Sequence, residues 1–286
     1  MTNLPDKIVR GMDLDGNFRV LCCDVTGTVR DTLHSQSPEG SEIQTFGELL
    51  VATILFRETM SPQLRVQGIA SAGNGSGQFV ADSHPTGDVR GLVQRRKADA
   101  LVTLVPGSTL RMMRSMPNGG VNQGIVELAE KPTIEHGLMA YMQISEQIVT
   151  MVGVGVVRDE AGEVTRAGGY LVQLLPGAKR GPLMVMTERL KDFEHVLEHL
   201  AKPEFTPDFL LDELLYAMPS ERLGESVVRF NCWCDELKVI SALASLPRHD
   251  LEDLANSEEA LHINCDYCQK AFVIAPKSLR GLLTQS

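Results

Sequence analysis

The sequence lacks the long apolar segments of a membrane protein, and it lacks an excess of positive charge. No apolar run approaches the roughly 18 residues that cross a bilayer. Residues 1–20 contain three aspartates and no apolar core of a secretory signal. The 27 lysines and arginines are outnumbered by 37 aspartates and glutamates, which gives a formal charge of −10 and disfavours binding to nucleic acid or to an anionic membrane. We therefore expect a cytoplasmic protein that binds neither.

Sequence motifs of common enzymes are absent or incomplete. The glycine-rich loop 71–77 does not follow the G-x-G-x-x-G order of a nucleotide site, and no serine lies in a G-x-S-x-G elbow. The segment Asp24–Thr28, DVTGT, imitates the phosphoaspartate motif of haloacid-dehalogenase-like phosphatases. No convincing acidic element for magnesium follows it. We therefore expect that the protein is not an enzyme. The alternative is that it is a phosphatase that uses Asp24.

A second short motif, His195–His199 with the sequence HVLEH, matches the H-x-x-E-H pattern of inverted zinc metalloproteases. A helix would place the two imidazoles one turn apart. Such proteases take their third ligand from a distant downstream glutamate, and no glutamate follows Glu259. We therefore expect both histidines on the polar face of a helix.

The chain has 286 residues, of which 43% are hydrophobic, enough for one large domain or about two with a substantial core. Residues rich in β-formers predict strands at 18–29, 151–157 and 170–175. Apolar residues at spacings of three and four predict helices at 48–60 and 134–148. Because strands and helices are mixed without a regular βαβ rhythm, the sequence predicts an α+β core domain over residues 1–183.

After the core domain, the sequence predicts a helical connector over residues 184–228. It predicts a C-terminal zinc module over residues 229–286. Thr187 is expected to cap a helix that carries one apolar stripe, formed by Leu190, Phe193, Leu197 and Leu200. Thr206 and Pro207 supply an N-cap and a first-turn proline for a second helix that runs to about Ala217.

Six cysteines are present, and four of them lie within the C-terminal segment 232–286. Cys232-x-Cys234 and Cys265-x-x-Cys268 form two local pairs, which is the arrangement of a tetrahedral Cys₄ zinc site. The second pair lies between two short β-forming segments, 261–263 and 272–274, and is predicted to be the turn of a hairpin. The site is expected to bind one Zn²⁺ per chain, either as an inert structural metal or as a redox-responsive one.

A unit this short holds roughly 3 to 8 kcal/mol of stability even when it is well built, and so small a core usually needs a covalent or metal link. Structural zinc contributes about 10–16 kcal/mol of folding free energy. Loss of the metal is therefore expected to unfold the module. An oxidant that joins the cysteines as disulfides removes the ligands, and so it couples oxidation to unfolding.

With these cysteines, the sequence resembles the redox-regulated chaperone family of heat-shock protein 33, also called the HslO chaperonin family. The resemblance covers most of the chain. It extends to Gly87-Asp-Val-Arg-Gly91, Tyr141-x-x-x-Ser145-Glu-Gln147 and Gly168-Gly-Tyr-Leu-Val-Gln-Leu-Leu-Pro-Gly177.

The resemblance implies an ATP-independent holdase that is inactive when reduced and bound to zinc. Under oxidative stress the disulfides Cys232–Cys234 and Cys265–Cys268 would form, zinc would leave, and the protein would hold unfolding client proteins and form a homodimer. Our hypothesis is that zinc loss releases the module and the connector together. Clients would then contact apolar connector residues such as Phe193, Leu197, Phe209, Leu210, Leu214 and Leu215.

Two features depart from the family pattern or lie outside it. Asp235 and Glu236 follow the first cysteine pair where the family often has a hydroxyl and basic residues, and residues 232–286 contain five basic and eight acidic side chains. Oxidation by peroxide is therefore expected to be slower than the family suggests. Cys22 and Cys23 are adjacent on a predicted strand, so we expect them to point to opposite faces as packing residues.

Overall fold

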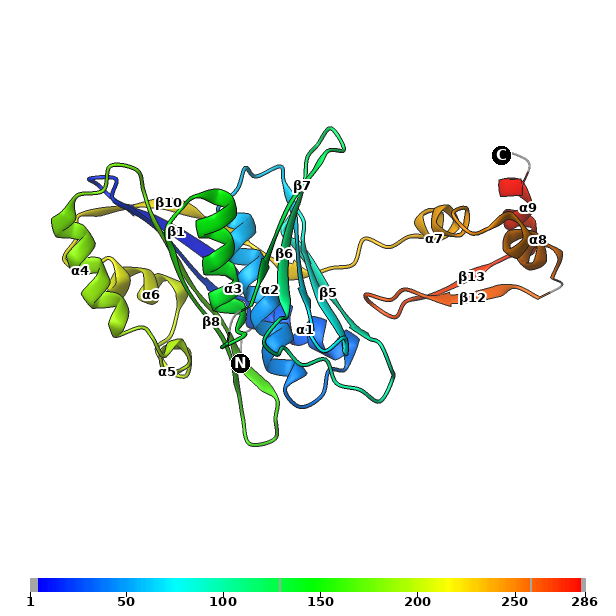
Figure 1. Ribbon diagram of the computed structural model, residues 1–286, viewed down its shortest axis with the longest axis horizontal. Helices are drawn as coiled ribbons and strands as arrows, with labels where there is room; N and C mark the ends of the chain where they lie inside the picture. Colours follow the sequence, from blue (N-terminus) through cyan, green and yellow to red (C-terminus); the bar gives the residue numbers. More distant parts are fainter. Residues whose placement is uncertain (1–4, 129, 258, 284–286) are drawn as a thin grey trace. The chain divides into compact units, whose positions relative to one another are not determined.

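The computed structural model describes residues 5–128, 130–257 and 259–283. Contacts divide the chain into two compact units, Met1–Phe230 and Asn231–Ser286, and each is described by itself (Figure 1). Both units mix helices with strands, which confirms the α+β class that the sequence predicts. No helix in the described ranges is both long enough and apolar enough to pass through a membrane.

One layer of the first unit is a five-stranded antiparallel sheet. Its strands are β1 (Lys7–Asp13), β2 (Phe18–Asp24), β8 (Thr150–Arg158), β9 (Val164–Leu174) and β10 (Ser220–Val227), in the order β10-β1-β2-β9-β8. The strand β2 is buried on both faces because its side chains alternate between two apolar clusters. Cys22 packs in one cluster and Cys23 in the other, which confirms the prediction for this pair.

The second layer is a six-stranded sheet. Its strands are β3 (Arg65–Ser71), β4 (Gly77–Ser83), β5 (Asp88–Arg95), β6 (Thr109–Ser115), β7 (Val121–Glu127) and β11 (Arg229–Phe230). Their order is β11-β5-β4-β3-β6-β7, and only the pairing of β11 with β5 is parallel among these described strands. The predicted glycine-rich loop is the tight link between β3 and β4, where Gly75 has φ +71°.

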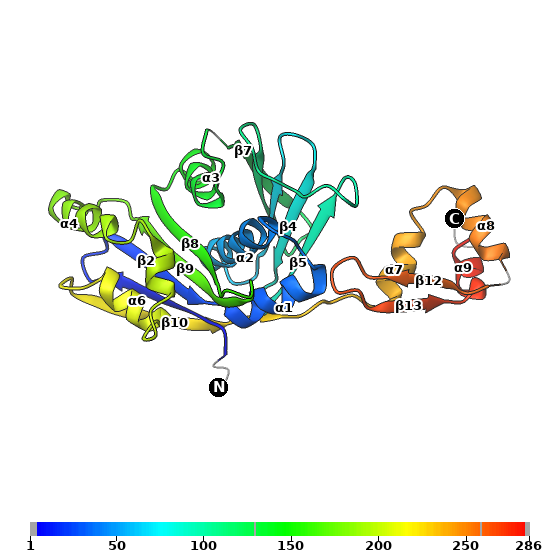
Figure 2. The same ribbon diagram turned by 90° about the horizontal axis from the view of Figure 1, so that it is seen from below.

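Helix α2 (Glu42–Glu58) lies between the two sheets (Figure 2). It contacts β3 and β4 of one sheet and β8 and β9 of the other. Thirteen of its 17 residues are buried, so side chains all round the helix contribute to the core. Two further helices pack around this core, α1 (Thr26–Gln36) and α3 (Ile134–Tyr141), and a π-helical turn (Met142–Glu146) continues α3.

Three helices cover the other face of the five-stranded sheet: α4 (Arg180–Lys191), α5 (Val196–Leu200) and α6 (Pro207–Leu214). Helix α5 contacts β8 and β9, and α6 contacts β1 and β2. Thr206 caps α6, because its side chain accepts a hydrogen bond from the backbone N–H of Phe209 at 3.0 Å, and Pro207 occupies the first turn. This confirms the predicted start of the helix, although the helix ends at Leu214, before Ala217.

Two expectations about residues 184–228 are wrong. Thr187 does not cap a helix, because α4 begins at Arg180 and the Thr187 hydroxyl donates to the carbonyl of Leu183 at 2.8 Å inside it. Residues 220–227 are not helical but form β10, which pairs with β1. Almost every residue of β10 is exposed, so pairing with β1, not a hydrophobic period, determines its conformation.

The second unit contains α7 (Glu236–Leu243), α8 (Arg248–Asn256), β12 (Leu261–Asn264), β13 (Ala271–Ile274) and α9 (Pro276–Leu283). The strands β12 and β13 form an antiparallel hairpin, which confirms the hairpin that the sequence predicts. Among the described residues, the apolar cluster of this unit has five buried members: Leu251, Ala255, Phe272, Ile274 and Leu279. The two apolar clusters of the first unit have thirty-six and sixteen buried members among the described residues.

Helices α4–α6 and strand β10 pack within the first unit, which the chain leaves after Phe230. The finer division into a core domain 1–183, a connector 184–228 and a zinc module 229–286 stays a prediction.

Candidate metal centre

Four cysteine side chains meet in the second unit. Cys232 and Cys234 lie between β11 and α7, and Cys265 and Cys268 lie in the turn between β12 and β13. Their Sγ atoms all lie within 4.8 Å of one another. In the described ranges, this is the one group of three or more potential ligand side chains close enough to share an ion. The fold therefore brings together all four residues that the sequence analysis selected.

Backbone hydrogen bonds close the turn that carries the second pair. The N–H of Cys265 donates to the carbonyl of Lys270 at 2.9 Å, and the N–H of Gln269 donates to the carbonyl of Cys265 at 2.8 Å. Gln269 has φ +58°, in the left-handed region that costs a residue with a Cβ about 1–2 kcal/mol. The sequence predicts the turn but not this strained position, because glycine or asparagine is the usual signal for it.

The other cysteine pair lies directly before α7 and is linked to the first turn of this helix. Asp235 is the N-cap of α7, and its carboxylate accepts a hydrogen bond from the backbone N–H of Lys238 at 2.8 Å. The Nζ of Lys238 lies 2.9 Å from the same carboxylate and donates to the carbonyl of Trp233. The hydrogen bond from Lys238 lowers the pKa of Asp235. Lys238 thus ties the residue between the two cysteines to the helix that follows them.

The four sulfurs fit a tetrahedral metal ion. Zn–S bonds of about 2.3 Å place the corners of a regular tetrahedron about 3.8 Å apart. The Sγ atoms of Cys232 and Cys265 are 3.8 Å apart, and those of Cys234 and Cys268 are 3.5 Å apart. Soft thiolate ligands in this arrangement suit zinc or an iron–sulfur centre better than a hard cation. The cysteines are therefore positioned to bind a metal ion.

Burial and crowding also affect the ionisation of the sulfurs. Burial raises the pKa of the Cys234 thiol and that of the Cys268 thiol, and hydrogen bonding with neighbouring thiols raises that of Cys234 further. Cys234 and Cys268 therefore favour the neutral thiol while no cation is bound. A divalent cation reverses this preference, since it binds the deprotonated form of every ligand.

The sulfurs are joined directly to the small core of the second unit. Cys234 and Cys265 both pack against its cluster of buried apolar side chains. Movement of either sulfur therefore removes contacts from a cluster that has few to lose.

The phosphatase-like segment is a structural turn. Asp24 ends β2, and its Oδ1 accepts hydrogen bonds from the hydroxyl of Thr26 at 2.6 Å and from the N–H of Thr26 at 3.2 Å. The Thr26 hydroxyl accepts a bond from the N–H of Ala167 at 3.0 Å. The strand predicted for 18–29 consequently ends at Asp24, where the chain turns into α1.

The two histidines of the protease-like motif do not share a helix face. His195 lies at the N-cap of α5, before the helix begins, so the expectation is wrong for this residue. The ring of His199 stacks on Phe193 with centroids 4.4 Å apart, and its Nε2 lies 2.9 Å from the carbonyl oxygen of Asp192. These contacts give His199 a packing role.

A two-sheet core with an appended four-cysteine unit defines a class of protein with a small metal-binding module. The sequence profile of the family described as "Hsp33 protein" matches residues 6–275. The chain therefore belongs to the Hsp33 family, as its motifs suggest.

Curated relatives and a solved structure agree with this assignment. The "33 kDa chaperonin" of Streptococcus sanguinis (strain SK36) is 26% identical over 97% of this chain and 98% of the relative. That of Streptococcus pneumoniae (strain Hungary19A-6) is 28% identical over the same shares. The crystal structure of a 33 kDa chaperonin (heat shock protein 33 homolog) from Thermotoga maritima has the same fold, with a TM-score of 0.83 at 21% identity over 98% of each chain. The relatives are named as chaperonins and not as enzymes, as the sequence predicts.

Proposed function

We propose that the protein is an ATP-independent holdase that oxidation activates. In the reduced state, Cys232, Cys234, Cys265 and Cys268 bind one Zn²⁺ per chain. Oxidation releases the ion, unfolds the C-terminal module and allows the protein to hold unfolding clients under oxidative stress. The observation that carries this proposal is the meeting of four sulfurs within 4.8 Å in a unit whose described core has five buried side chains. Membership of a family whose curated members are named chaperonins supports the chaperone part.

The energy of the metal site is large enough to control folding of the module. Structural zinc contributes about 10–16 kcal/mol, whereas a whole domain is commonly stable by about 5–15 kcal/mol. Five buried apolar side chains are a small core for a unit that extends over residues 231–286. Zinc release therefore leaves the second unit without enough stabilisation to stay folded.

The redox step balances with hydrogen peroxide as the oxidant. Each pair of thiolates loses two electrons and forms one S–S bond, and one peroxide accepts these electrons together with two protons to give two waters. Two disulfides thus consume two peroxides and four protons. The Zn²⁺ keeps its charge and leaves because disulfide sulfurs are poor ligands compared with thiolates.

The choice of partners decides whether oxidation opens the module or locks it. Disulfides within the local pairs, Cys232–Cys234 and Cys265–Cys268, close short loops and leave the two halves of the site free to separate. A disulfide between the pairs, such as Cys232–Cys265, would close a loop of about 34 residues and stabilise the fold by about 4 kcal/mol. The proposed switch requires the local pairing.

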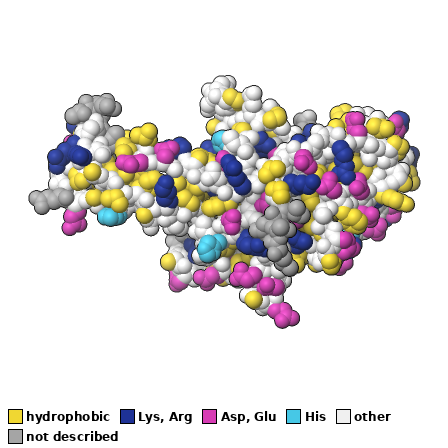
Figure 3. Space-filling view, turned by 180° about the vertical axis from the view of Figure 1, so that it is seen from behind, with side chains coloured by type: hydrophobic (Ala, Val, Ile, Leu, Met, Phe, Trp, Pro, Cys, Tyr) yellow, Lys and Arg dark blue, Asp and Glu magenta, His cyan; other side chains and the backbone are white. Residues whose placement is uncertain are grey.

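The client surface proposed from the sequence is partly buried at rest. Phe193, Leu210, Leu214 and Leu215 pack beneath α4–α6 against the five-stranded sheet, whereas Leu197 and Phe209 are 43% and 39% exposed. On the face shown in Figure 3, hydrophobic side chains are interspersed with charged ones. We infer that clients bind best after α4–α6 loosen from the sheet and expose the buried residues.

A reducing resting compartment suits this mechanism, since thiolates must persist until stress occurs. We therefore place the protein in the cytoplasm, with unfolding proteins as its partners, a homodimer as its oxidised form, and neither nucleic acid nor a membrane as a target.

The test compares reduced, zinc-loaded protein with peroxide-treated protein in suppressing the light scattering of a heated client. We expect suppression only after oxidation, with one zinc released per chain and two disulfides that peptide mapping assigns to the local pairs. Equal suppression in both states would show that the metal is purely structural.

Cys22→Ala provides the matched control. This variant also removes one thiol, but from the core of the first unit, so zinc content and oxidative activation should match those of the wild type. Disulfides mapped between the pairs would refute the opening step even if activity rose.

A further inference from the structure

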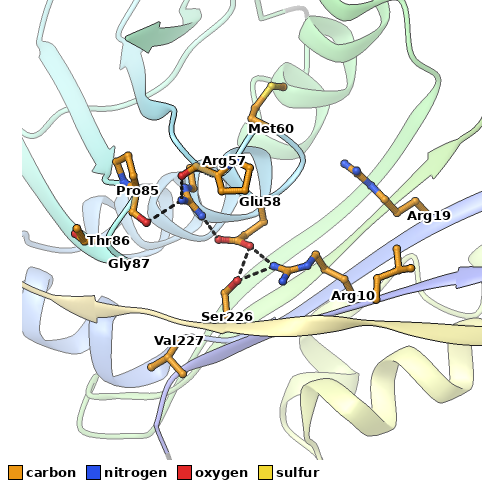
Figure 4. Close-up of a pocket in the computed structure, with 12 residues that line it drawn as sticks. Arg10, Arg19, Arg57, Glu58, Met60, Pro85, Thr86, Gly87, Ser226 and Val227 are labelled. Carbon is orange, nitrogen blue, oxygen red and sulfur yellow. Dashed lines mark hydrogen bonds and ion pairs between the residues drawn. The ribbon is translucent and has the colours of Figure 1, made fainter. Parts of the chain in front are cut away.

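A cavity of about 470 Å³ lies within the first unit, at some distance in sequence from the cysteines. Of the twelve described residues that line it, three are arginines, Arg10, Arg19 and Arg57, and one, Glu58, is acidic (Figure 4). The formal charge of the lining is therefore +2. Its volume lies within the range of roughly 300–1,000 Å³ that is usual for small-molecule sites.

The single carboxylate is already fully engaged. One oxygen of Glu58 accepts a hydrogen bond from Arg57 at 2.5 Å. The other accepts one from Arg10 and one from the hydroxyl of Ser226 at 2.9 Å. The Glu58 side chain is 3% exposed, so these bonds replace its hydration. The one negative charge of Glu58 is thus shared between two positive charges, those of Arg10 and Arg57.

Arg19 has no acidic partner in the described part of the chain. Its Nη2 donates to the carbonyl of Thr59 at 2.9 Å, while its buried Nε has no hydrogen-bond partner. Figure 4 shows its guanidinium apart from the group that meets at Glu58. Burial and the nearby Arg10 lower the pKa of Arg19, which indicates a cation held where positive charge is unfavourable.

Arg57, a second arginine of the lining, also has a buried nitrogen without a partner. The side chain of Arg57 is 8% exposed. Its Nη2 donates to the carbonyls of Pro62 and Pro85 at 2.8 and 3.0 Å, but its buried Nε has no partner. Buried donors without acceptors are rare because each loses its hydration without replacement. The two Nε atoms are themselves buried, so what the cavity offers a ligand is the positive charge of Arg19, for which the described residues supply no acidic partner.

We propose that this cavity binds a small phosphorylated ligand whose phosphate pairs with Arg19. A phosphate monoester carries close to two negative charges at neutral pH, which matches the net charge of the lining. The planar fork of a guanidinium suits two phosphate oxygens at once. Met60, Pro62 and Leu223 supply apolar wall for the rest of the ligand. Inorganic phosphate shares the recognised group but leaves this wall unused.

The test is a calorimetric titration of the reduced, zinc-bound full chain at constant ionic strength. The probes are inorganic phosphate, ribose 5-phosphate and unphosphorylated ribose. We expect saturable binding of ribose 5-phosphate, weaker binding of phosphate, and none of ribose. Phosphate binding as tightly as its ester would assign the site to the free ion and refute the apolar part of the proposal. If neither anion binds saturably, the whole proposal is overturned.

Arg19→Gln should weaken binding of ribose 5-phosphate by about tenfold or more, because a charge-assisted bidentate contact is lost. Arg180→Gln is the matched control, since it removes the same charge from an exposed arginine outside the cavity, and it should bind like the wild type. Unchanged binding in Arg19→Gln would overturn the assignment.

A second pair of variants tests the proposal even if the Arg19→Gln variant fails to fold. Leu223 lies on the exposed strand β10 at the cavity wall, so it tolerates polar side chains. Leu223→Glu brings a carboxylate to the wall and should abolish binding by repulsion, whereas Leu223→Gln has the same shape without the charge and should retain it. Equal binding by the two variants would contradict a phosphate at this place. The result does not depend on the cysteine site, because every sample stays reduced.

Discussion

Removal of zinc from the reduced protein should unfold the second unit and leave the first one folded. The magnitude follows from the helices: α7, α8 and α9 contain 25 of the 86 residues in the described α-helices. If all three melt, the helical circular dichroism signal falls by about three tenths. Loss of the ion removes about 10–16 kcal/mol of folding free energy. This far exceeds the stability that a cluster of five buried side chains provides.

The chain provides its own reporter for this transition. Trp233 is the single tryptophan, and it lies between Cys232 and Cys234. Its emission should move to longer wavelength in one step with zinc release, as a chelator is added under reducing conditions. Limited proteolysis in parallel should cut after Phe230 and spare the first unit.

Cys268→Ser, with one ligand removed, should show the unfolded pattern before any chelator is added, whereas Cys22→Ala should behave like the wild type. The reasoning is refuted if the zinc-free wild type keeps its helical signal, its tryptophan emission and its resistance to protease.

Three further predictions concern single carboxylates. Burial raises the pKa of Glu48 to about 7, so the folded state retains its proton while the unfolded state loses it, and stability falls as pH rises from about 4.5 to 7. Glu48→Gln should remove this fall and gain about 2–3 kcal/mol over the wild type at pH 8 in urea unfolding, with no gain at pH 4. Asp6 accepts bonds from the N–H groups of Gly27 and Thr28 at the start of α1, and Asp6→Ala should lower the unfolding free energy of the first unit by about 1 kcal/mol; an unchanged urea midpoint would count against this capping role. Asp235→Ala removes the N-cap of α7, so peroxide should release zinc faster than from the control Asp253→Ala, and equal rates by a metallochromic dye would contradict the coupling of α7 to the site.

The four-cysteine site is the part of the structure that the sequence predicts best. The spacing of a local pair such as Cys265 and Cys268 is enough to predict a shared site. The two residues between them are too few to let the cysteines lie far from each other. The hairpin around them was predictable because two short β-forming segments, 261–263 and 272–274, flank the pair. Asp235 also has a local signature as a helix cap, although its sequence context first suggested only an unfavourable charge.

Features that depend on distant partners escaped sequence reasoning. Strand β10 has little apolar content, and its conformation comes from pairing with β1, which lies at the opposite end of the first unit's sequence. Glu58 meets Arg10 and Ser226 across separations of 48 and 168 residues, so no local pattern marks the arginine-lined cavity. The break between α4 and α5 likewise follows from packing on the sheet, since the apolar residues alone continue through it.

The two buried cysteines of β2 make the chemistry of the others easy to count. Cys22 and Cys23 are fully enclosed by the core, and burial raises the pKa of both thiols well above the usual range. An alkylating reagent added without denaturant therefore titrates only the four zinc-ligand candidates. Formation of the two proposed disulfides would lower this count from four to zero, whereas unfolding of the first unit would expose Cys22 and Cys23 and raise it by up to two, so alkylation separates the proposed switch from damage to the core.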